Sequence, residues 1–247
     1  MTGTLVLLRH GESTFNAAQV FTGLLDADLT PAGAAQVSEA ARLLTGAGIR
    51  ADVLVVSPMV RAVRTASLLY EALGYAPEET VVTWRLVERD YGCLTHVSKA
   101  EARERFGEEA FFTWRRTVHG RPPSASDAQR ASWVDPPPVA DSGSLVAGVG
   151  ESLADVIARV LPVWTEELLP RLRAGGTVLV ASHGNTLRAL VTDMLGLSDA
   201  EAEQLNIPAG HPWVFSVGPD GAVAPGRYLD ADAAALAEAA VAAEGGT

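Results

Sequence analysis

The chain has 247 residues, of which 48% are hydrophobic and 20% are charged, a composition that excludes disorder over most of its length. Its formal charge of −11 excludes a global field that would attract nucleic acid or anionic membranes. No apolar stretch approaches the roughly 20 residues of a membrane span, and the single cysteine, Cys93, excludes an internal disulfide. We therefore expect a globular, cytoplasmic protein.

In the first half of the chain, short apolar runs alternate with helical patterns. Thr30 and Pro31 are residue types that favour an N-cap and a first helical position, and they predict a helix to about residue 44. A second helix is predicted over residues 61–73. Continuous apolar runs predict strands buried on both faces at residues 5–8, 53–56 and 80–83.

The middle of the chain breaks this regularity. Residues 98–117 have the pattern of a polar helix, whereas residues 119–150 are rich in Pro, Ser, Ala and Gly. Loops of this length inside compact domains are usually functional or disordered. We expect residues 119–150 to form a loop or flap excursion, either a mobile flap over the functional site or a surface insertion.

Regular patterns return after this excursion. Ser152 predicts the cap of a helix that ends near residues 175–176 and is kinked or divided at Pro162. The Ala- and Glu-rich residues 230–247 are expected to form a peripheral tail. Further strands are predicted at residues 177–181 and 213–217, and further helices from Thr186 and from a capping box at Ser198.

Strands that alternate with helices predict an α/β fold, with a mostly parallel, doubly wound sheet and helices on both faces. We expect residues 1–247 to form a single domain. In such sheets, ligands bind beyond the carboxyl ends of the strands. Candidate functional residues should therefore follow the predicted strands directly.

Two predicted strands end in similar residues. Arg9-His10-Gly11 follows the first strand, and His183-Gly184-Asn185 follows the strand at 177–181. A His-Gly pair alone carries little information, and His119-Gly120 is a third such pair in the chain. The informative feature is that two pairs would share one edge of the sheet.

These residue types suit phosphoryl transfer. A neutral imidazole is a competent nucleophile, and transfer otherwise requires positioning and charge neutralisation. Arg9 and Arg61 can each bind phosphate oxygens with a guanidinium fork, and a protonated His183 can donate to the transferring group. Two histidines could instead bind zinc, but a third ligand at the usual spacing is missing from the sequence, and we predict no metal.

The residues Leu5 to Asn16, LVLLRHGESTFN, resemble the opening motif of the histidine phosphatase superfamily, in particular its 2,3-bisphosphoglycerate-dependent phosphoglycerate mutases. The resemblance covers nearly all of residues 4–217 except 119–150. Glu88-Arg89 with Tyr91-Gly92, and Arg115-Arg116, are similar to the mutase branch specifically.

The resemblance implies a phosphoglycerate mutase-like fold and a role for each matching residue. His10 would be the phosphorylated nucleophile and Glu88 the general acid and base, with Arg9, Arg61 and His183 completing the catalytic set. The substrate would be a small phosphorylated metabolite, 2,3-bisphosphoglycerate would be the phosphoryl primer, and a homo-oligomer is possible. The implied substrate-binding residues are Ser13, Asn16, Thr22, Gly23, Tyr91, Lys99, Arg115, Arg116, Gly184 and Asn185.

Three positions depart from the mutase pattern. Asp90 stands where the mutases usually have His, and Thr95-His96 where they have Gln-Gly. If Asp90 and Glu88 share a face, the second carboxylate would raise the pKa of Glu88. The sequence therefore leaves two functions open: a mutase that interconverts 3-phosphoglycerate and 2-phosphoglycerate, and a phosphatase or mutase of the same superfamily that acts on another metabolite. A third reading, a binding module of the same fold, would not need the nucleophile.

Overall fold

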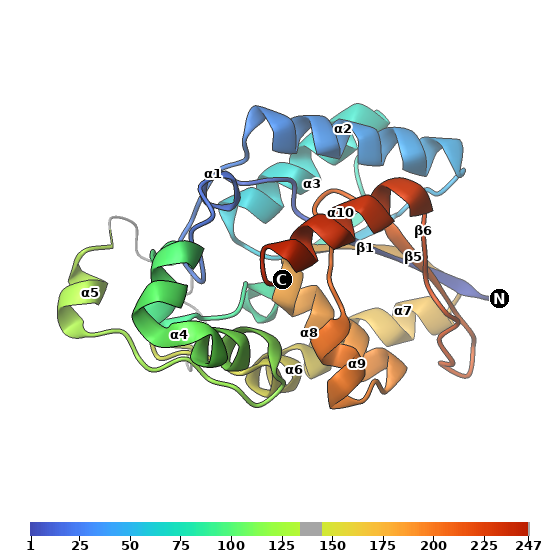
Figure 1. The fold of residues 1–247 in the computed structure, drawn as a ribbon. Helices are drawn as coiled ribbons and strands as arrows, with labels where there is room; N and C mark the ends of the chain where they lie inside the picture. Colours follow the sequence, from blue (N-terminus) through green and yellow to red (C-terminus); the bar gives the residue numbers. More distant parts are fainter. Residues whose placement is uncertain (134–144, 247) are drawn as a thin grey trace.

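A six-stranded sheet forms the centre of the computed structural model, which describes residues 1–133 and 145–246 (Figure 1). The strand order is β3-β2-β4-β1-β5-β6. The first four of these strands are parallel, and β5 and β6 are antiparallel to their neighbours. The strands are β1 (Gly3–Arg9), β2 (Val53–Val56), β3 (Glu79–Val82), β4 (Thr177–Ser182), β5 (Trp213–Val217) and β6 (Arg227–Tyr228). The predicted fold class and all five predicted strands are confirmed; only the two-residue β6 was not expected.

Helices cover both faces of the sheet, as the doubly wound prediction requires (Figure 1). Successive side chains of β1 point to opposite faces. Val6 and Leu8 pack with α2 (Pro31–Gly46) and α3 (Val60–Leu73). Leu5 and Leu7 pack with the helices of the opposite face: α6 (Leu153–Pro162), α7 (Leu169–Arg173), α8 (Gly184–Leu195) and α9 (Asp199–Gln204). The continuous apolar runs of the sequence are thus buried on both sides.

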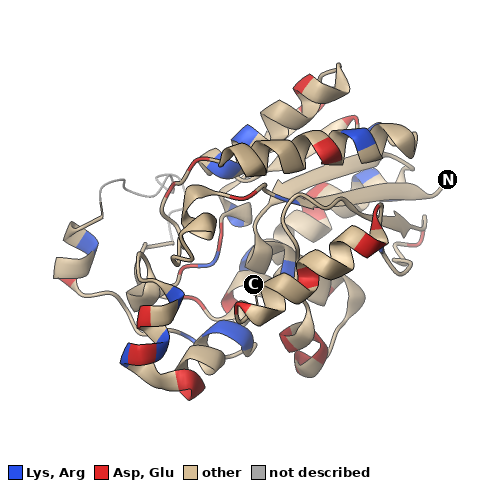
Figure 2. Ribbon diagram, turned by 45° about the horizontal axis from the view of Figure 1, so that its top comes forward, with Lys and Arg blue, Asp and Glu red and all other residues tan. Residues whose placement is uncertain are grey.

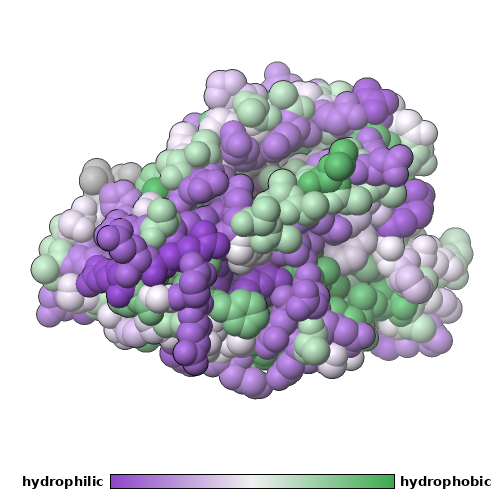
Figure 3. Space-filling model, in the orientation of Figure 1, coloured by the Kyte–Doolittle hydropathy of each residue, from purple (hydrophilic) through white to green (hydrophobic). Residues whose placement is uncertain are grey.

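Pro162 divides the predicted helix rather than merely bending it. The α-helical hydrogen bonding of α6 ends at this residue, a π-helical segment spans Val163–Leu168, and α7 follows. Proline has no amide hydrogen to give to the preceding turn, so a wider turn absorbs the mismatch. The polar helix α4 (Lys99–Arg116) is also interrupted, at Gly107, whose φ of 82° only glycine adopts readily. It presents a strongly hydrophilic surface (Figure 3).

The ends of the 119–150 excursion pack against the loop around Asp90. The Cys93 amide donates to the Pro123 carbonyl at 2.8 Å, and the Glu151 amide donates to the Asp90 carbonyl at 2.8 Å. The short helix α5 (Asp127–Ala131) lies in the first part of the excursion. The centre of the expected flap, residues 134–144, lies outside the described residues.

The end of the chain differs from the peripheral tail that the sequence predicted. Helix α10 (Ala231–Ala243), whose charged residues are all acidic, runs beside β6 (Figures 1 and 2). The residues after it reach the pocket described below, where the Glu244 carboxylate pairs with Lys99. Sequence periodicity could not reveal this contact, because it joins residues 145 positions apart. Within residues 1–133 and 145–246, no helix is long and apolar enough to span a membrane.

Candidate active site

One pocket opens beyond the carboxyl ends of β1 and β4, where the sequence analysis placed the chemistry. Glu12, Gln36, Ala209 and the end of the chain also contribute to its wall. Three predicted site residues, Ser13, Arg116 and His183, are buried but do not line it. The predicted residues that do line it are Arg9, His10, Asn16, Thr22, Gly23, Arg61, Glu88, Tyr91, Lys99, Arg115, Gly184 and Asn185.

Strand pairing brings the two histidines together. Arg9 lies opposite Ser182 in the parallel β1–β4 ladder, and the His10 amide donates to the Ser182 carbonyl at 2.9 Å. His10 and His183 therefore leave the sheet side by side, with ring centroids 5.1 Å apart and planes inclined at 61°. The two strand-end histidines meet as predicted.

The surroundings of His10 hold its ring in the form that a nucleophile requires. Its Nδ1 lies 2.7 Å from the Gly11 carbonyl, which can only accept, so Nδ1 carries the hydrogen and Nε2 keeps its lone pair. Arg61 donates from Nε to this Nε2 over 3.3 Å. Burial, followed by the charges of Arg61 and Arg9, holds the pKa of His10 well below 6.5. His10 is neutral at physiological pH.

Two buried arginines place positive charge beside His10. Arg61 is anchored by the carbonyls of Leu25, at 2.9 Å, and Gly23, at 3.2 Å. Burial lowers the pKa of Arg61 to about 10, so it stays a cation at neutral pH. Arg9 is held by the Ile207 carbonyl at 2.7 Å, and its buried Nε has no partner among the described residues. A donor of this kind is available to an anion in the pocket.

His183 is fixed by a residue that sequence reasoning missed. Ser57 Oγ lies 2.8 Å from His183 Nε2 and also accepts from the Met59 amide at 3.3 Å. If the hydroxyl donates to Nε2, the hydrogen of the ring is on Nδ1, a buried atom with no partner in the described part of the chain. Ser57 follows β2 directly, so the rule that found the histidines could also have found it.

The protonated His183 that the sequence analysis predicted is not supported by the surroundings of its ring. Burial and the Arg61 charge hold the pKa of His183 well below 6.5. A neutral ring still offers one N–H donor. An arriving phosphate would add the negative charge that favours a second proton.

Glu88 lies on the pocket wall, on the irregular segment after the short turn Trp84–Leu86. Its Oε1 accepts from the Arg89 amide at 2.7 Å. The Asp90 carboxylate instead accepts from the amides of Gly92, at 3.0 Å, and Gly150, at 2.9 Å. Burial raises the pKa of Asp90, and Glu151 is the acidic neighbour that contributes to this rise. The expected coupling between Asp90 and Glu88 is therefore not supported.

A second group of cations, Lys99 and Arg115, also lines the pocket. Arg115 donates from Nη1 to the Glu244 carbonyl at 2.7 Å, and Lys99 pairs with the Glu244 carboxylate. Burial lowers the pKa of Arg115 to about 10 and lowers that of Lys99 as well. Arg116 turns away, toward the carbonyls of Glu203 and Leu205. The pair of adjacent arginines is thus split between the pocket and the scaffold.

Hydrogen bonds orient the neutral polar residues of the site. Asn185 donates from Nδ2 to the Tyr91 hydroxyl at 2.7 Å, while its buried Oδ1 has no partner among the described residues. Ser13 caps the short helix α1 (Thr14–Ala17) and donates to Asn16 Oδ1 at 2.9 Å. Ser13 therefore orients Asn16 rather than facing the pocket. Among residues 1–133 and 145–246, no group of three or more His, Cys, Asp or Glu side chains is placed to hold a metal ion.

Comparison with known proteins agrees with this arrangement. The family model of the histidine phosphatase superfamily (branch 1) matches residues 5–224, and the chain belongs to this superfamily. It is 44% identical to the 2,3-bisphosphoglycerate-dependent phosphoglycerate mutase of a Nocardioides species, over 99% of this chain and 100% of that protein. It is 42% identical to the protein of the same name from Corynebacterium glutamicum, over 98% of each chain.

Solved structures show the same fold. A mycobacterial glucosyl-3-phosphoglycerate phosphatase matches with a TM-score of 0.67 and 24% identity, over 92% of this chain and 97% of that one. At this identity the similarity supports the fold and leaves the substrate open.

Proposed function

We propose that the chain is a phosphoglycerate mutase that interconverts 3-phosphoglycerate and 2-phosphoglycerate through a phosphohistidine on His10. The carrying observation is one pocket lined by two groups of cations: Arg9 and Arg61 beside His10, and Lys99 and Arg115 beside Glu244. A bisphosphorylated carboxylate carries roughly five negative charges at neutral pH, since each phosphate monoester carries about −1.5 to −2. A single transferring phosphate would not require the second group of cations.

In this mechanism His10 Nε2 attacks phosphorus while the bond from phosphorus to the substrate oxygen breaks. Glu88 gives a proton to the departing oxygen and takes a proton from the substrate hydroxyl in the reverse transfer. Arg9 and Arg61 neutralise the transferring group, His183 donates a hydrogen bond to it, and the side-chain amides of Asn16 and Asn185 orient the substrate. Lys99 and Arg115 bind the carboxylate and the second phosphate.

The proposed primer, 2,3-bisphosphoglycerate, fits the chemistry of this pocket. Arg9 Nε is a buried nitrogen atom of a residue that lines the pocket and has no partner among the described residues, which suits an anion that supplies acceptor oxygens. The primer supplies the phosphoryl group that first loads His10. The chain's own residues then hold that group and keep water from it.

The three departures from the mutase pattern bear on the alternative, a superfamily enzyme with another substrate. Asp90 is bound to backbone amides, and neither Thr95 nor the exposed His96 lines the pocket. His96 adopts the φ of 66° that glycine favours, and it stacks on Phe15. Because the three departures lie outside the pocket wall, they leave its cations and Glu88 in place and do not by themselves argue for another substrate.

Turnover of 3-phosphoglycerate, measured with and without 2,3-bisphosphoglycerate, tests the proposal. We expect 2-phosphoglycerate to form, and to form faster once the primer has loaded His10. Release of inorganic phosphate without 2-phosphoglycerate would favour the phosphatase. If neither phosphoglycerate reacts, the substrate must be another phosphorylated metabolite. That result would not contradict the phosphohistidine on His10.

A further inference from the structure

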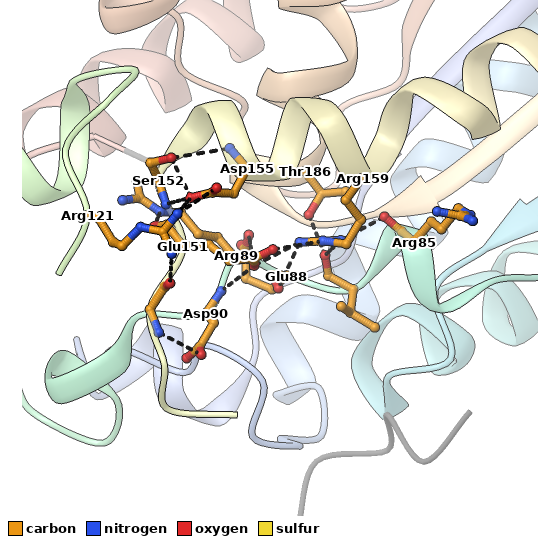
Figure 4. A network of polar contacts seen from close by, with 12 residues as sticks. Arg85, Glu88, Arg89, Asp90, Arg121, Glu151, Ser152, Asp155, Arg159 and Thr186 are labelled. Carbon is orange, nitrogen blue, oxygen red and sulfur yellow. Dashed lines mark hydrogen bonds and ion pairs between the residues drawn. The ribbon is translucent and has the colours of Figure 1, made fainter. Parts of the chain in front are cut away.

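A buried ion pair outside the pocket wall forms hydrogen bonds with the segment that carries Glu88 (Figure 4). Arg159 of α6 binds Glu151 through two parallel hydrogen bonds, both of 3.0 Å, with side chains 5% and 9% exposed. The remaining donors of Arg159 reach main-chain carbonyls: Arg85 at 2.7 Å, Val87 at 3.0 Å and, at a longer 3.5 Å, Glu88 itself. The Arg159 guanidinium thus binds both the Glu151 carboxylate and three main-chain carbonyls around Glu88.

Glu151, the acidic partner, also forms hydrogen bonds with the segment that carries Glu88. Its Oε2 accepts from the Asp90 amide at 2.9 Å, and its carbonyl accepts from Arg89 Nε at 2.6 Å. Arg89 and Asp90 follow Glu88 directly, so the contacts of the pair fall on both sides of the proposed acid–base residue. None of these contacts touches the pocket, because neither Glu151 nor Arg159 lines it.

Physical chemistry argues against stability alone as the reason for this pair. Desolvating two charges is costly, and a buried ion pair can often be replaced by apolar residues without loss of stability. What apolar residues cannot supply is a planar fork with donors fixed in direction. The segment around Glu88 has no sheet ladder of its own, so its carbonyls are held by side-chain donors. Besides Arg159, the hydroxyls of Ser182 and Thr186 donate to the carbonyls of Leu86 and Val87.

We infer that Arg159 and Glu151 are positioning residues for Glu88: the pair fixes the backbone from residue 85 to residue 90 and so aims the Glu88 carboxylate at the substrate oxygen. This inference rests on the acid–base role of Glu88 in the proposed function. It does not depend on which phosphorylated metabolite is the substrate.

The test compares two leaving groups. A phosphate ester of an alcohol needs a proton as the alkoxide departs, whereas 4-nitrophenyl phosphate releases a stable anion and depends little on a general acid. Arg159→Met should lower kcat toward phosphoglycerate, or toward glycerol phosphate, by about 10- to 100-fold, within the range that general acid–base catalysis supplies. Transfer from 4-nitrophenyl phosphate to His10 should change by less than about 3-fold.

A double-mutant cycle with Glu88→Gln shows whether Arg159→Met lowers kcat through Glu88. If the pair acts through Glu88, adding Arg159→Met to Glu88→Gln should cost almost nothing more. Arg159→Lys and Glu151→Gln, milder changes, guard against failure to fold and should show the same selectivity for the alcohol ester. Arg121→Met is the matched control, since its ion pair with Asp155 in the same network is half-exposed.

Equal losses with both esters, or a full Arg159→Met loss that persists in the Glu88→Gln background, would overturn the inference. Absence of phosphoglycerate turnover by the unaltered chain would instead refute the proposed substrate. The comparison with glycerol phosphate would then still decide whether Arg159 acts through Glu88.

Discussion

At the scale of single residues, His10 and His183 both have lowered pKa values, a property that could not be predicted from the sequence. Both rings are buried beside Arg61, and both pKa values lie well below 6.5. The sequence located the two histidines, because strand ends can be predicted from apolar runs. It did not give their protonation states, which depend on burial and on Ser57, Arg61 and Arg9 arriving from other elements.

The lowered pKa values of the two histidines predict that the folded chain loses stability in acid. Below about pH 6.5 the unfolded chain binds protons on these histidines that the folded chain does not, so the free energy of unfolding should fall as pH falls. From pH 6.5 to 5.5 each histidine should contribute roughly 1 kcal/mol to the loss. Urea unfolding of His10→Gln should show a smaller loss over this interval than the unaltered chain. Parallel pH dependences in the two proteins would contradict the assignment.

At the scale of elements, the loop after β1 and the start of α2 are in backbone contact. A Cβ on Gly33 would lie 2.1 Å from the Glu12 carbonyl oxygen, and one on Gly11 would lie 2.4 Å from the Gly33 oxygen. The helix and its Thr30 cap were predicted from the sequence. The close approach was not, since nothing local distinguishes Gly33 from the other glycine of α2, Gly46.

Gly33→Ala should therefore destabilise the chain by about 1–3 kcal/mol, the usual cost of forcing a methyl group into filled space, and should slow phosphorylation of the displaced His10. Gly46→Ala, with no atom within 4 Å of the added methyl, is the control and should be neutral or slightly stabilising. Urea midpoints measure both. Equal midpoints for the two variants would show that the loop after β1 moves aside without a loss of stability, which would contradict the prediction.

The same limit of local patterns applies to the other elements. The residue pattern predicted the strands, the capping boxes and the break at Pro162, since each has a short-range physical cause. It missed the contact of Glu244 with Lys99, which joins residues 145 positions apart. It also missed the role of Arg159 and Glu151, which are near each other in the sequence but bind a segment more than 60 positions away. The predicted flap also stays a prediction, as residues 134–144 lie outside the described part of the chain.

At the scale of the whole molecule, an anionic protein concentrates cations in one pocket. The formal charge is −11, yet Arg9, Arg61, Lys99 and Arg115 all line the site. Acidic and basic residues are interspersed over the outer helices (Figure 2). The field that attracts a polyanionic substrate must therefore be local, where burial leaves it poorly screened.

Arg115→Met tests whether the second group of cations, Lys99 and Arg115, serves substrate binding. A hydrogen bond to a charged group contributes about 1.5–3 kcal/mol, so kcat/KM for phosphoglycerate should fall at least about tenfold. Phosphoryl transfer from 4-nitrophenyl phosphate, which has no carboxylate, should change little. Arg116→Met, at a residue that binds carbonyls behind the pocket, separates the two roles and should act mainly on stability. Equal loss of both activities in Arg115→Met would assign Arg115 to the scaffold.

Labelling with radioactive 2,3-bisphosphoglycerate tests the central proposal, a covalent phosphohistidine, most directly. After rapid denaturation in alkali, the unaltered chain should retain close to one acid-labile phosphate per molecule, and peptide mapping should place it on His10. His119→Ala should label fully and His10→Ala not at all. Acid-labile phosphate that persists at full level in His10→Ala would contradict the account.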